Sequence, residues 1–294
     1  MHKSVLTKEV VLYTNIKEGG ILLDGTLGGG GHAQAIAEAL HGNVHIIGLD
    51  RDSDALVRSR RRLDGSARSL DLIESNFRNL DTALDSLHVD AVDGIVLDLG
   101  WNAYQLESGR GFSFMVDEPL SMSYSIGKEG SFNAYTIVNE WNEEHIEAII
   151  KGYGEEMHSR RIAEGIVKHR AEKPITSTFE LRDIIVDSVP FWYRRRRIHP
   201  ATKTFQALRI AVNDELDALR EGLSKGISAL KKRGRISVIS FHSLEDRIVK
   251  RFFRDSESTG QGSVITKRPI RAGAEELTEN PRSRSAKLRV FEKK

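Results

Sequence analysis

Cysteine is absent from the 294 residues, which excludes a disulfide framework and a cysteine-liganded metal. The first ten residues, MHKSVLTKEV, lack a signal-peptide pattern. No apolar run approaches the roughly 18 residues that a membrane-spanning helix needs. Internal repeats and low-complexity segments are missing too. These absences predict a cytoplasmic protein that neither is exported nor enters a membrane.

The formal net charge of +2 hides a gradient along the chain. Residues 1–110 carry 11 Lys or Arg against 16 Asp or Glu, whereas residues 247–294 carry 13 against 6. The C-terminal part is therefore basic. With 39% hydrophobic residues the chain can bury a full core, as one large domain or two ordinary ones.

A glycine-rich turn follows the first apolar run, in LLDGTLGGGGH at residues 22–32, and a second apolar run ends at Asp50. Glycine lets the backbone approach a ligand closely and adopt positive φ without strain. A carboxylate at the end of the second strand can accept hydrogen bonds from two ribose hydroxyls. This arrangement predicts an adenosine cofactor site, the alternative being a flexible surface loop.

Two adenosine cofactors compete for this site. Gly28, Gly30 and Ala33 fit the G-x-G-x-x-A spacing of dinucleotide folds, in which a diphosphate sits at the helix N-terminus. Asp24, however, ends the first strand just before the turn. A carboxylate there attracts a cationic ligand and repels a diphosphate, so the sequence favours S-adenosylmethionine over NAD.

Further apolar runs at residues 69–75, 93–100 and 234–243 have the composition of strands buried on both faces. The run DGIVLDLG puts Asp98 at a carboxyl strand end, where open α/β sheets bind ligands. An amphipathic run at 204–230 precedes the last of these strands, and residues 263–270 and 285–293 predict two antiparallel strands joined by a loop. The expected fold is α/β, with a doubly wound, Rossmann-like sheet.

Helical patterns cover residues 141–154, 158–173 and 176–189, the last with Ser177 or Thr178 as N-cap. We therefore expect a discontinuous sheet domain at residues 1–112 and 200–294, interrupted by a helical domain at 113–199. That insertion ends in PFWYRRRRIHP at 190–200, a mixture of aromatics and arginines that can bind phosphates and stack bases. A solvated charged face, with the aromatics anchoring a loop, is the alternative interpretation.

The segment FHSLED at 241–246 invites a hydrolase interpretation, which we reject because Ser243 lacks the G-x-S-x-G glycines. We expect His242 and Glu245 to cap and orient the next helix, with Ser243 as N-cap and Asp246 at the third helical position in the manner of a capping box. The basic run RIVKRFFR at 247–254 would then face outward, where RNA phosphates could reach it.

Eight motifs in order along the chain resemble those of the bacterial MraW family, also called RsmH: DGTLGGGGH (24–32), GLDRD (48–52), DGIVLDLG (93–100), RGFSF (110–114), YGEE (153–156), HPATKTFQALRIAVNDEL (199–216), ISFHSLEDRIVKRFF (239–253) and ENPRSRSAKLRV (279–290). The resemblance implies a methyltransferase that uses S-adenosylmethionine to methylate N4 of a cytidine in the decoding centre of 16S ribosomal RNA. It also implies the small ribosomal subunit as partner and RNA handling by the inserted helical domain.

The resemblance implies a cofactor site made of seven residues: Gly30, Gly31, His32, Asp50, Phe77, Asp98 and Gln105. Asp50 would bind the ribose and Phe77 would lie beside the adenine. The alternatives are that Phe77 is a core aromatic and that His32 is a solvent-facing residue at a helix start. No metal site is expected, since a histidine beside a glycine turn lacks further ligands at suitable spacing.

Two segments depart from the family pattern. Residues 100–107 read GWNAYQLE in place of GVSSPQLD, and residues 117–125 read DEPLSMSYS in place of a run like DGPLDMRMD. Both follow the strand that carries Asp98, so they should lie near the target base. Trp101 and Tyr104 either stack on that base or pack under a loop.

The expected chemistry is methyl transfer to an exocyclic amine, whose lone pair is delocalised into the ring. Asp98 is the best-placed group to accept its hydrogen bond, and we predict it to be catalytic. The alternatives are a methyltransferase for another RNA or DNA base, a catalytically silent assembly factor that binds S-adenosylmethionine, and, more remotely, an NAD-dependent oxidoreductase. The sequence leaves open whether the chain forms a homodimer.

Overall fold

The computed structural model describes residues 4–100, 106, 108–124 and 132–294. The chain divides into two compact units: unit 1, Met1–Gly100 with Leu216–Lys294, and unit 2, Trp101–Glu215. The expected domain boundaries, 112/113 and 199/200, both fall inside unit 2. Within the described parts of the chain, every helix is too short or too polar to cross a membrane.

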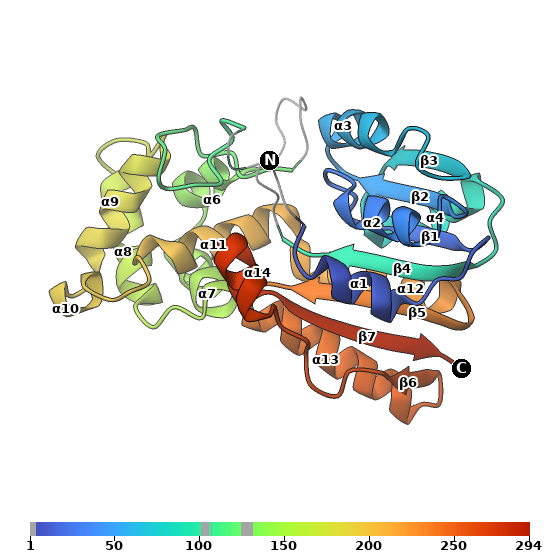
Figure 1. Ribbon diagram of the computed structural model, residues 1–294. Helices are drawn as coiled ribbons and strands as arrows, with labels where there is room; N and C mark the ends of the chain where they lie inside the picture. Colours follow the sequence, from blue (N-terminus) through green and yellow to red (C-terminus); the bar gives the residue numbers. More distant parts are fainter. Residues whose placement is uncertain (1–3, 101–105, 107, 125–131) are drawn as a thin grey trace. The chain divides into compact units, whose positions relative to one another are not determined.

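Unit 1 is built on one seven-stranded sheet with the order β3-β2-β1-β4-β5-β7-β6 (Figure 1). Strands β1 to β5 are parallel to one another, whereas β7 is antiparallel to its neighbours β5 and β6. The expected doubly wound α/β fold is confirmed. The strands are β1 (Ile21–Asp24), β2 (His45–Asp50), β3 (Ser69–Glu74), β4 (Val92–Asp98), β5 (Leu230–Ser240), β6 (Gly262–Val264) and β7 (Lys287–Lys293).

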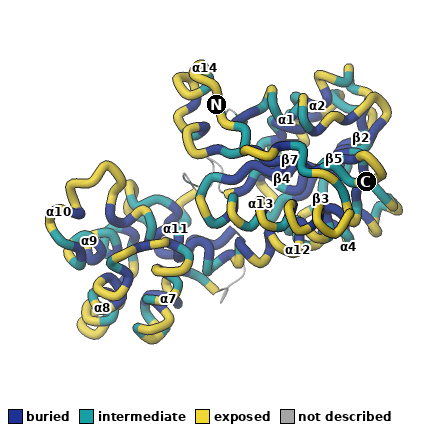
Figure 2. Tube along the Cα trace, turned by 90° about the horizontal axis from the view of Figure 1, so that it is seen from below, coloured by how far each residue is buried: buried dark blue, intermediate teal, exposed yellow. Residues whose placement is uncertain are grey.

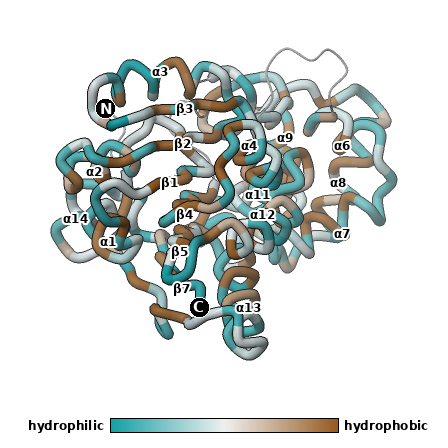
Figure 3. The backbone as a smooth tube through the Cα atoms, turned by 90° about the vertical axis from the view of Figure 1, so that its right-hand side faces the viewer, coloured by the Kyte–Doolittle hydropathy of each residue, from teal (hydrophilic) through white to brown (hydrophobic). Residues whose placement is uncertain are grey.

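Helices cover both faces of this sheet because successive side chains of a strand point to opposite faces. Leu22 packs in the core with α1 (Thr7–Thr14), α2 (Gly31–Ala39) and α3 (Ser53–Leu63). Leu23 packs in the other core with α4 (Leu80–Ser86), α12 (Glu215–Ala229) and α13 (Ser243–Ser258). The two helical layers lie on either side of the strands in Figure 3, and β4, β5 and β7 are dark blue, as buried strands, in Figure 2. Both faces of the sheet are therefore apolar, as the continuous apolar runs predicted.

Several predicted elements of unit 1 differ in detail. The expected strand at 263–270 is limited to β6 and an isolated bridge between Ile270 and Leu288. The expected loop after it contains α14 (Ala274–Glu279) and the 3₁₀ helix Pro281–Ser285. The N-cap of α13 is His242, with Glu245 as its capping-box partner. The capping role expected of this pair is confirmed, whereas the register predicted from Ser243 and Asp246 was wrong by one residue. A histidine nitrogen can accept the capping hydrogen bond as a hydroxyl does.

Unit 2 is helical, and its core is formed by the apolar faces of α6 (Ala134–Glu140), α7 (Glu143–Gly154), α8 (Ser159–Arg170), α9 (Thr178–Ser188), α10 (Phe191–Arg194) and α11 (Ala201–Asn213). Helices α7, α8 and α9 match the predicted helical ranges, and Ser177 caps α9. The predicted run at 204–230 is two helices, because Asp214 adopts a left-handed φ of 51°. Helix α11 packs on α6, α7 and α9, which moves the boundary of the helical unit to residue 215.

Candidate cofactor and catalytic site

Three neighbouring strands of unit 1 each end in an aspartate: β1 at Asp24, β2 at Asp50 and β4 at Asp98. Because these strands are parallel, their carboxyl ends meet at one edge of the sheet. From β1 the strand order runs outward through β2 to β3, and the chain then returns to place β4 on the other side of β1. Open α/β sheets bind ligands at such a reversal of strand order, outside the carboxyl ends of the strands. The structure thus brings together the three acids that the sequence singled out.

The glycine turn between β1 and α2 is held by hydrogen bonds from its surroundings. Gly28 and Gly30 adopt positive φ values of 53° and 73°. The Asp50 carboxylate accepts the Gly28 N–H at 2.8 Å and the Asp52 N–H at 2.9 Å, while the Ser59 hydroxyl donates to the Gly28 carbonyl at 2.7 Å. These contacts hold the turn in a fixed conformation, which favours a ligand-binding loop over the alternative of a flexible surface loop. Gly31 begins α2, and a Cβ there would lie 2.2 Å from the Ser4 hydroxyl.

Thr26 connects two of the three acids. Its backbone N–H donates to the Asp24 carboxylate at 3.2 Å, and its hydroxyl accepts the Asp98 N–H at 2.6 Å. Asp24 is only 1% exposed, and the buried Oδ1 of Asp98 has no hydrogen-bond partner among the described residues. A buried acceptor without a partner is costly unless a ligand supplies the missing donor or positive charge.

Burial of these acids makes their ionised forms costly. Burial raises the pKa of Asp24 to about 7, and the Asp98 and Asp50 carboxylates add to the rise, while His32 and the Thr26 N–H oppose it. Burial likewise raises the pKa of Asp98 to about 7, with a smaller contribution from the Glu245 carboxylate. The pKa of Asp50 is also raised by burial, although backbone N–H groups oppose the shift. Such a cluster favours a cationic ligand and disfavours a diphosphate.

His32 lies inside the molecule, so the interpretation as a solvent-facing residue was wrong. It is 5% exposed, and its Nε2 donates to the Val5 carbonyl at 2.8 Å. Because a carbonyl oxygen only accepts, this bond assigns a proton to Nε2. The other ring nitrogen, Nδ1, faces the Asp98 carboxylate at 3.8 Å. His32 therefore links the glycine turn to the end of β4.

Phe77 begins a 3₁₀ helix (Phe77–Asn79) immediately after β3, and Asn76 caps it. Its half-buried ring packs on α12, where a Cβ added to Gly222 would lie 2.5 Å from Cδ2 of the ring. Packing on the core supports the interpretation as a core aromatic, while a contact with adenine stays a prediction. Gln105, Trp101 and Tyr104 lie outside the described residues.

Glu245 belongs to the same edge, and sequence reasoning gave it only a capping role. It is buried, and its carboxylate accepts the Phe241 N–H at 2.8 Å. The β4–β5 pairing sets Asp98 beside Ile239, shortly before this segment. The negative charge of Glu245 therefore acts on Asp98 and contributes to the rise of its pKa. The signal that could have found it is a buried acid just after the last parallel strand.

In unit 2, the segment that departs from the family pattern is tied to the end of α11. The Asn213 side chain donates to the Met122 carbonyl at 2.7 Å and accepts the Tyr124 N–H at 2.9 Å. The Tyr124 hydroxyl donates to Glu215 at 2.8 Å, and Arg209 contacts both oxygens of that carboxylate at 2.9 and 3.0 Å. Tyr124, which stands where the family pattern has methionine, is therefore part of an ordered network in this chain.

The doubly wound sheet with antiparallel β7, the glycine turn after β1 and the acids at three strand ends place the protein in the class of S-adenosylmethionine-dependent methyltransferases. The Asp98 oxygen, unpartnered among the described residues, and the carboxylate cluster fit a cofactor that carries a positive charge on sulfur. Asp24, Asp50, Asp98 and the glycine turn are the groups positioned to hold it.

Comparison with known sequences narrows the class. The profile of the MraW methylase family matches residues 1–294, and the chain belongs to this family. It is 47% identical to "Ribosomal RNA small subunit methyltransferase H" of Pelobacter propionicus, over 99% of this chain and 98% of the relative. Proteins of the same name from Lachnospira eligens and Persephonella marina are each 44% identical, covering 99% and 98% of this chain and 97% and 98% of the relatives.

Proposed function

We propose that this protein transfers a methyl group from S-adenosylmethionine to N4 of a cytidine in the decoding centre of 16S ribosomal RNA, acting in the cytoplasm on the small ribosomal subunit. Relatives named as small-subunit ribosomal RNA methyltransferases, at 44–47% identity over the full chain, support this substrate. The observation that carries the proposal is the carboxylate of Asp98 at the carboxyl end of β4, whose buried Oδ1 has no hydrogen-bond partner in the part of the chain that the structure describes.

Asp98 has the properties that amine methylation requires. The cytosine amine must give its lone pair to the methyl carbon, and a hydrogen bond from its N–H to a carboxylate makes that lone pair more available. The bound cofactor supplies a methyl group on positively charged sulfur. After transfer, the nitrogen must lose one proton. The Asp98 carboxyl, whose pKa burial raises in the ligand-free protein, is positioned to accept that proton.

The test is transfer of labelled methyl from S-adenosylmethionine to small ribosomal subunits isolated from cells that lack the modification, followed by nucleoside analysis. We expect label in N4-methylcytidine. Label in another nucleoside would assign the enzyme to a different base, in keeping with its altered 117–125 segment. Binding of S-adenosylmethionine without any transfer would identify a silent assembly factor.

Unit 2 supplies a candidate RNA contact at α10. Phe191 and Trp192 are 65% and 52% exposed, while Tyr193 is buried and donates its hydroxyl hydrogen to Glu156. Only Tyr193 therefore anchors the segment in the core. The guanidinium carbons of Arg195 and Arg196 lie 4.4 and 5.0 Å from the centroids of the Phe191 and Trp192 rings. Exposed aromatics stacked with arginines suit nucleobases and phosphates.

We expect that changing Arg195, Arg196 and Arg197 together to glutamine weakens RNA binding and flattens its salt dependence. Arg194 is left in place because its guanidinium is paired with Asp187 at 3.3 Å. Each lost phosphate contact lowers the slope of log K against log salt by about 0.7 for single-stranded RNA, so three contacts give a change of about 2. Fluorescence anisotropy at several salt concentrations measures this slope.

The matched control removes three exposed charges elsewhere in unit 2, by changing Lys151, Arg161 and Lys168 to glutamine. The two triple variants have the same net charge. An equal slope change in both would mean that the effect is general electrostatics and that the α10 segment is not an RNA contact.

A further inference from the structure

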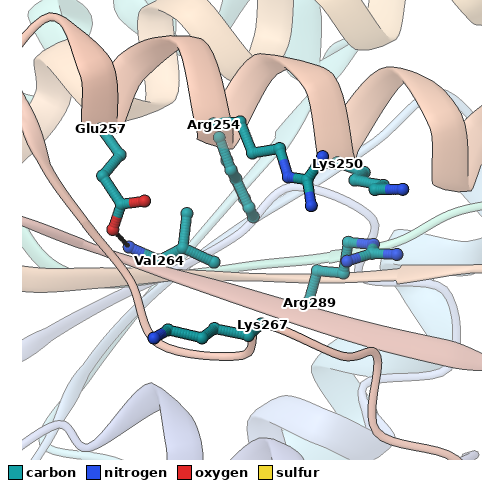
Figure 4. A pocket seen from close by; sticks show the side chains of 7 residues that line it. Lys250, Arg254, Glu257, Val264, Lys267 and Arg289 are labelled. Atoms are coloured by element: carbon teal, nitrogen blue, oxygen red, sulfur yellow. Dashed lines mark hydrogen bonds between the residues drawn. The ribbon is translucent and has the colours of Figure 1, made fainter.

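A basic pocket lies in unit 1 between α13 and the strands β6 and β7 (Figure 4). Its cavity volume is about 190 Å³. Four cationic side chains line it: Lys250 and Arg254 from α13, Lys267 from the segment after β6, and Arg289 from β7. The heads of Lys250, Arg254 and Arg289 point toward the same end of the pocket in Figure 4.

The positive charge of this pocket is only partly compensated. Arg289 is paired with Asp246 at 2.7 Å, whereas Lys250, Arg254 and Lys267 have no ion-pair partner among the described residues. The one lining acid, Glu257, lies at the other end, where its carboxylate accepts the Val264 N–H at 2.9 Å. Cations gathered in this way repel one another unless an anion lies between them. The pocket is therefore built for a negatively charged group.

The floor of the pocket is apolar. Phe253 is buried and stacks on Phe291 with a centroid distance of 5.4 Å, and Val264 lines the side. A cationic end beside an apolar floor matches a phosphate together with its attached sugar better than a bare ion. Arg247 and Arg251 extend the positive charge along the exposed side of α13, which suits a polyanion rather than a single small anion.

We propose that this pocket binds a backbone phosphate of RNA and so anchors the substrate on unit 1, separately from the site of methyl transfer. The proposal rests on the proposed function for the identity of the polyanion. The chemistry of recognition is that of a phosphate ester held by lysine and arginine. Contacts of this kind position the RNA and carry no sequence information.

The test measures binding of a short single-stranded RNA of mixed sequence to the full-length protein at several salt concentrations. The variant K250Q/R254Q should bind roughly tenfold more weakly near physiological salt, with a slope reduced by about 1.4 for two contacts. The variant E257Q should bind a few-fold more tightly, because it removes the opposing charge and keeps an oxygen for the Val264 N–H. The matched control K8Q/K232Q removes two exposed charges of unit 1 outside the pocket.

Equal weakening in K250Q/R254Q and K8Q/K232Q would overturn the proposal. Titration of inorganic phosphate by calorimetry separates the sources of the ligand: variants that lose phosphate binding but keep full RNA affinity would show a site for a free phosphate, against the proposal. Methyl transfer by the unaltered protein is measured independently. A protein that modifies no ribosomal RNA, yet loses RNA affinity only in K250Q/R254Q, would contradict the proposed function and leave the pocket proposal supported.

Discussion

The Asp98→Asn variant should lose methyl transfer by about 10²–10⁴-fold, the usual contribution of a positioned proton acceptor. The asparagine side chain has nearly the shape of the carboxylate. The backbone N–H of residue 98 can still donate to the Thr26 hydroxyl, as it does at 2.6 Å in the unaltered protein. It lacks the charge needed to polarise the cytosine amine and to take its proton. Single-turnover transfer at saturating S-adenosylmethionine separates this loss from any weaker cofactor binding.

Asp93→Asn is the matched control for that variant, because Asp93 lies at the opposite end of the same strand. Its carboxylate pairs with Lys231 at 2.8 Å and accepts the Ile21 N–H, also at 2.8 Å. We expect its transfer rate to stay close to that of the unaltered protein. Transfer by Asp98→Asn within a few-fold of the Asp93→Asn rate would assign the acceptor role to another group.

The acids at the strand ends could be predicted from sequence because each stops an apolar run. Such runs identify buried strands, and parallel strands bring their last residues to one edge whatever the length of the connections. Asp24, Asp50 and Asp98 were therefore found without a structure. Their elevated pKa values were not, since those depend on how completely the turn and helices cover each carboxylate.

Glu245 shows where sequence reasoning stops. Its contribution to the pKa of Asp98 arises only because β5 pairs with β4 after the whole of unit 2 has intervened in the chain. No local pattern records such a pairing.

The end of α11 is a second example of a feature that the sequence pattern does not reveal. Asp214 interrupts a continuous amphipathic pattern through its left-handed backbone, without the glycine or proline that normally signals a break.

The Asp24→Asn variant should be more stable than the unaltered protein at pH 8 and should bind S-adenosylmethionine at least tenfold more weakly. The folded-state pKa of Asp24, about 7, lies above its ordinary value of 3.8, so the folded protein binds the proton more tightly than the unfolded chain does. The contribution of Asp24 to the free energy of unfolding is therefore fully present below about pH 4 and is lost as the pH rises through 7. Asparagine avoids that loss, and its side-chain oxygen can still accept the Thr26 N–H.

The cofactor reverses this balance, because its positive charge stabilises the ionised carboxylate. A charge-assisted contact contributes about 1.5–3 kcal/mol, and 1.4 kcal/mol corresponds to a tenfold change in affinity. Melting temperatures from pH 4 to 8, with and without S-adenosylmethionine, measure both effects. Without cofactor, the stability advantage of Asp24→Asn over the unaltered protein should grow with pH. The rise in melting temperature that S-adenosylmethionine causes should be smaller in the variant than in the unaltered protein. A stability gain that is independent of pH would show that Asp24 does not titrate in this range. An unchanged affinity for S-adenosylmethionine would show that the charge of Asp24 does not contribute to cofactor binding.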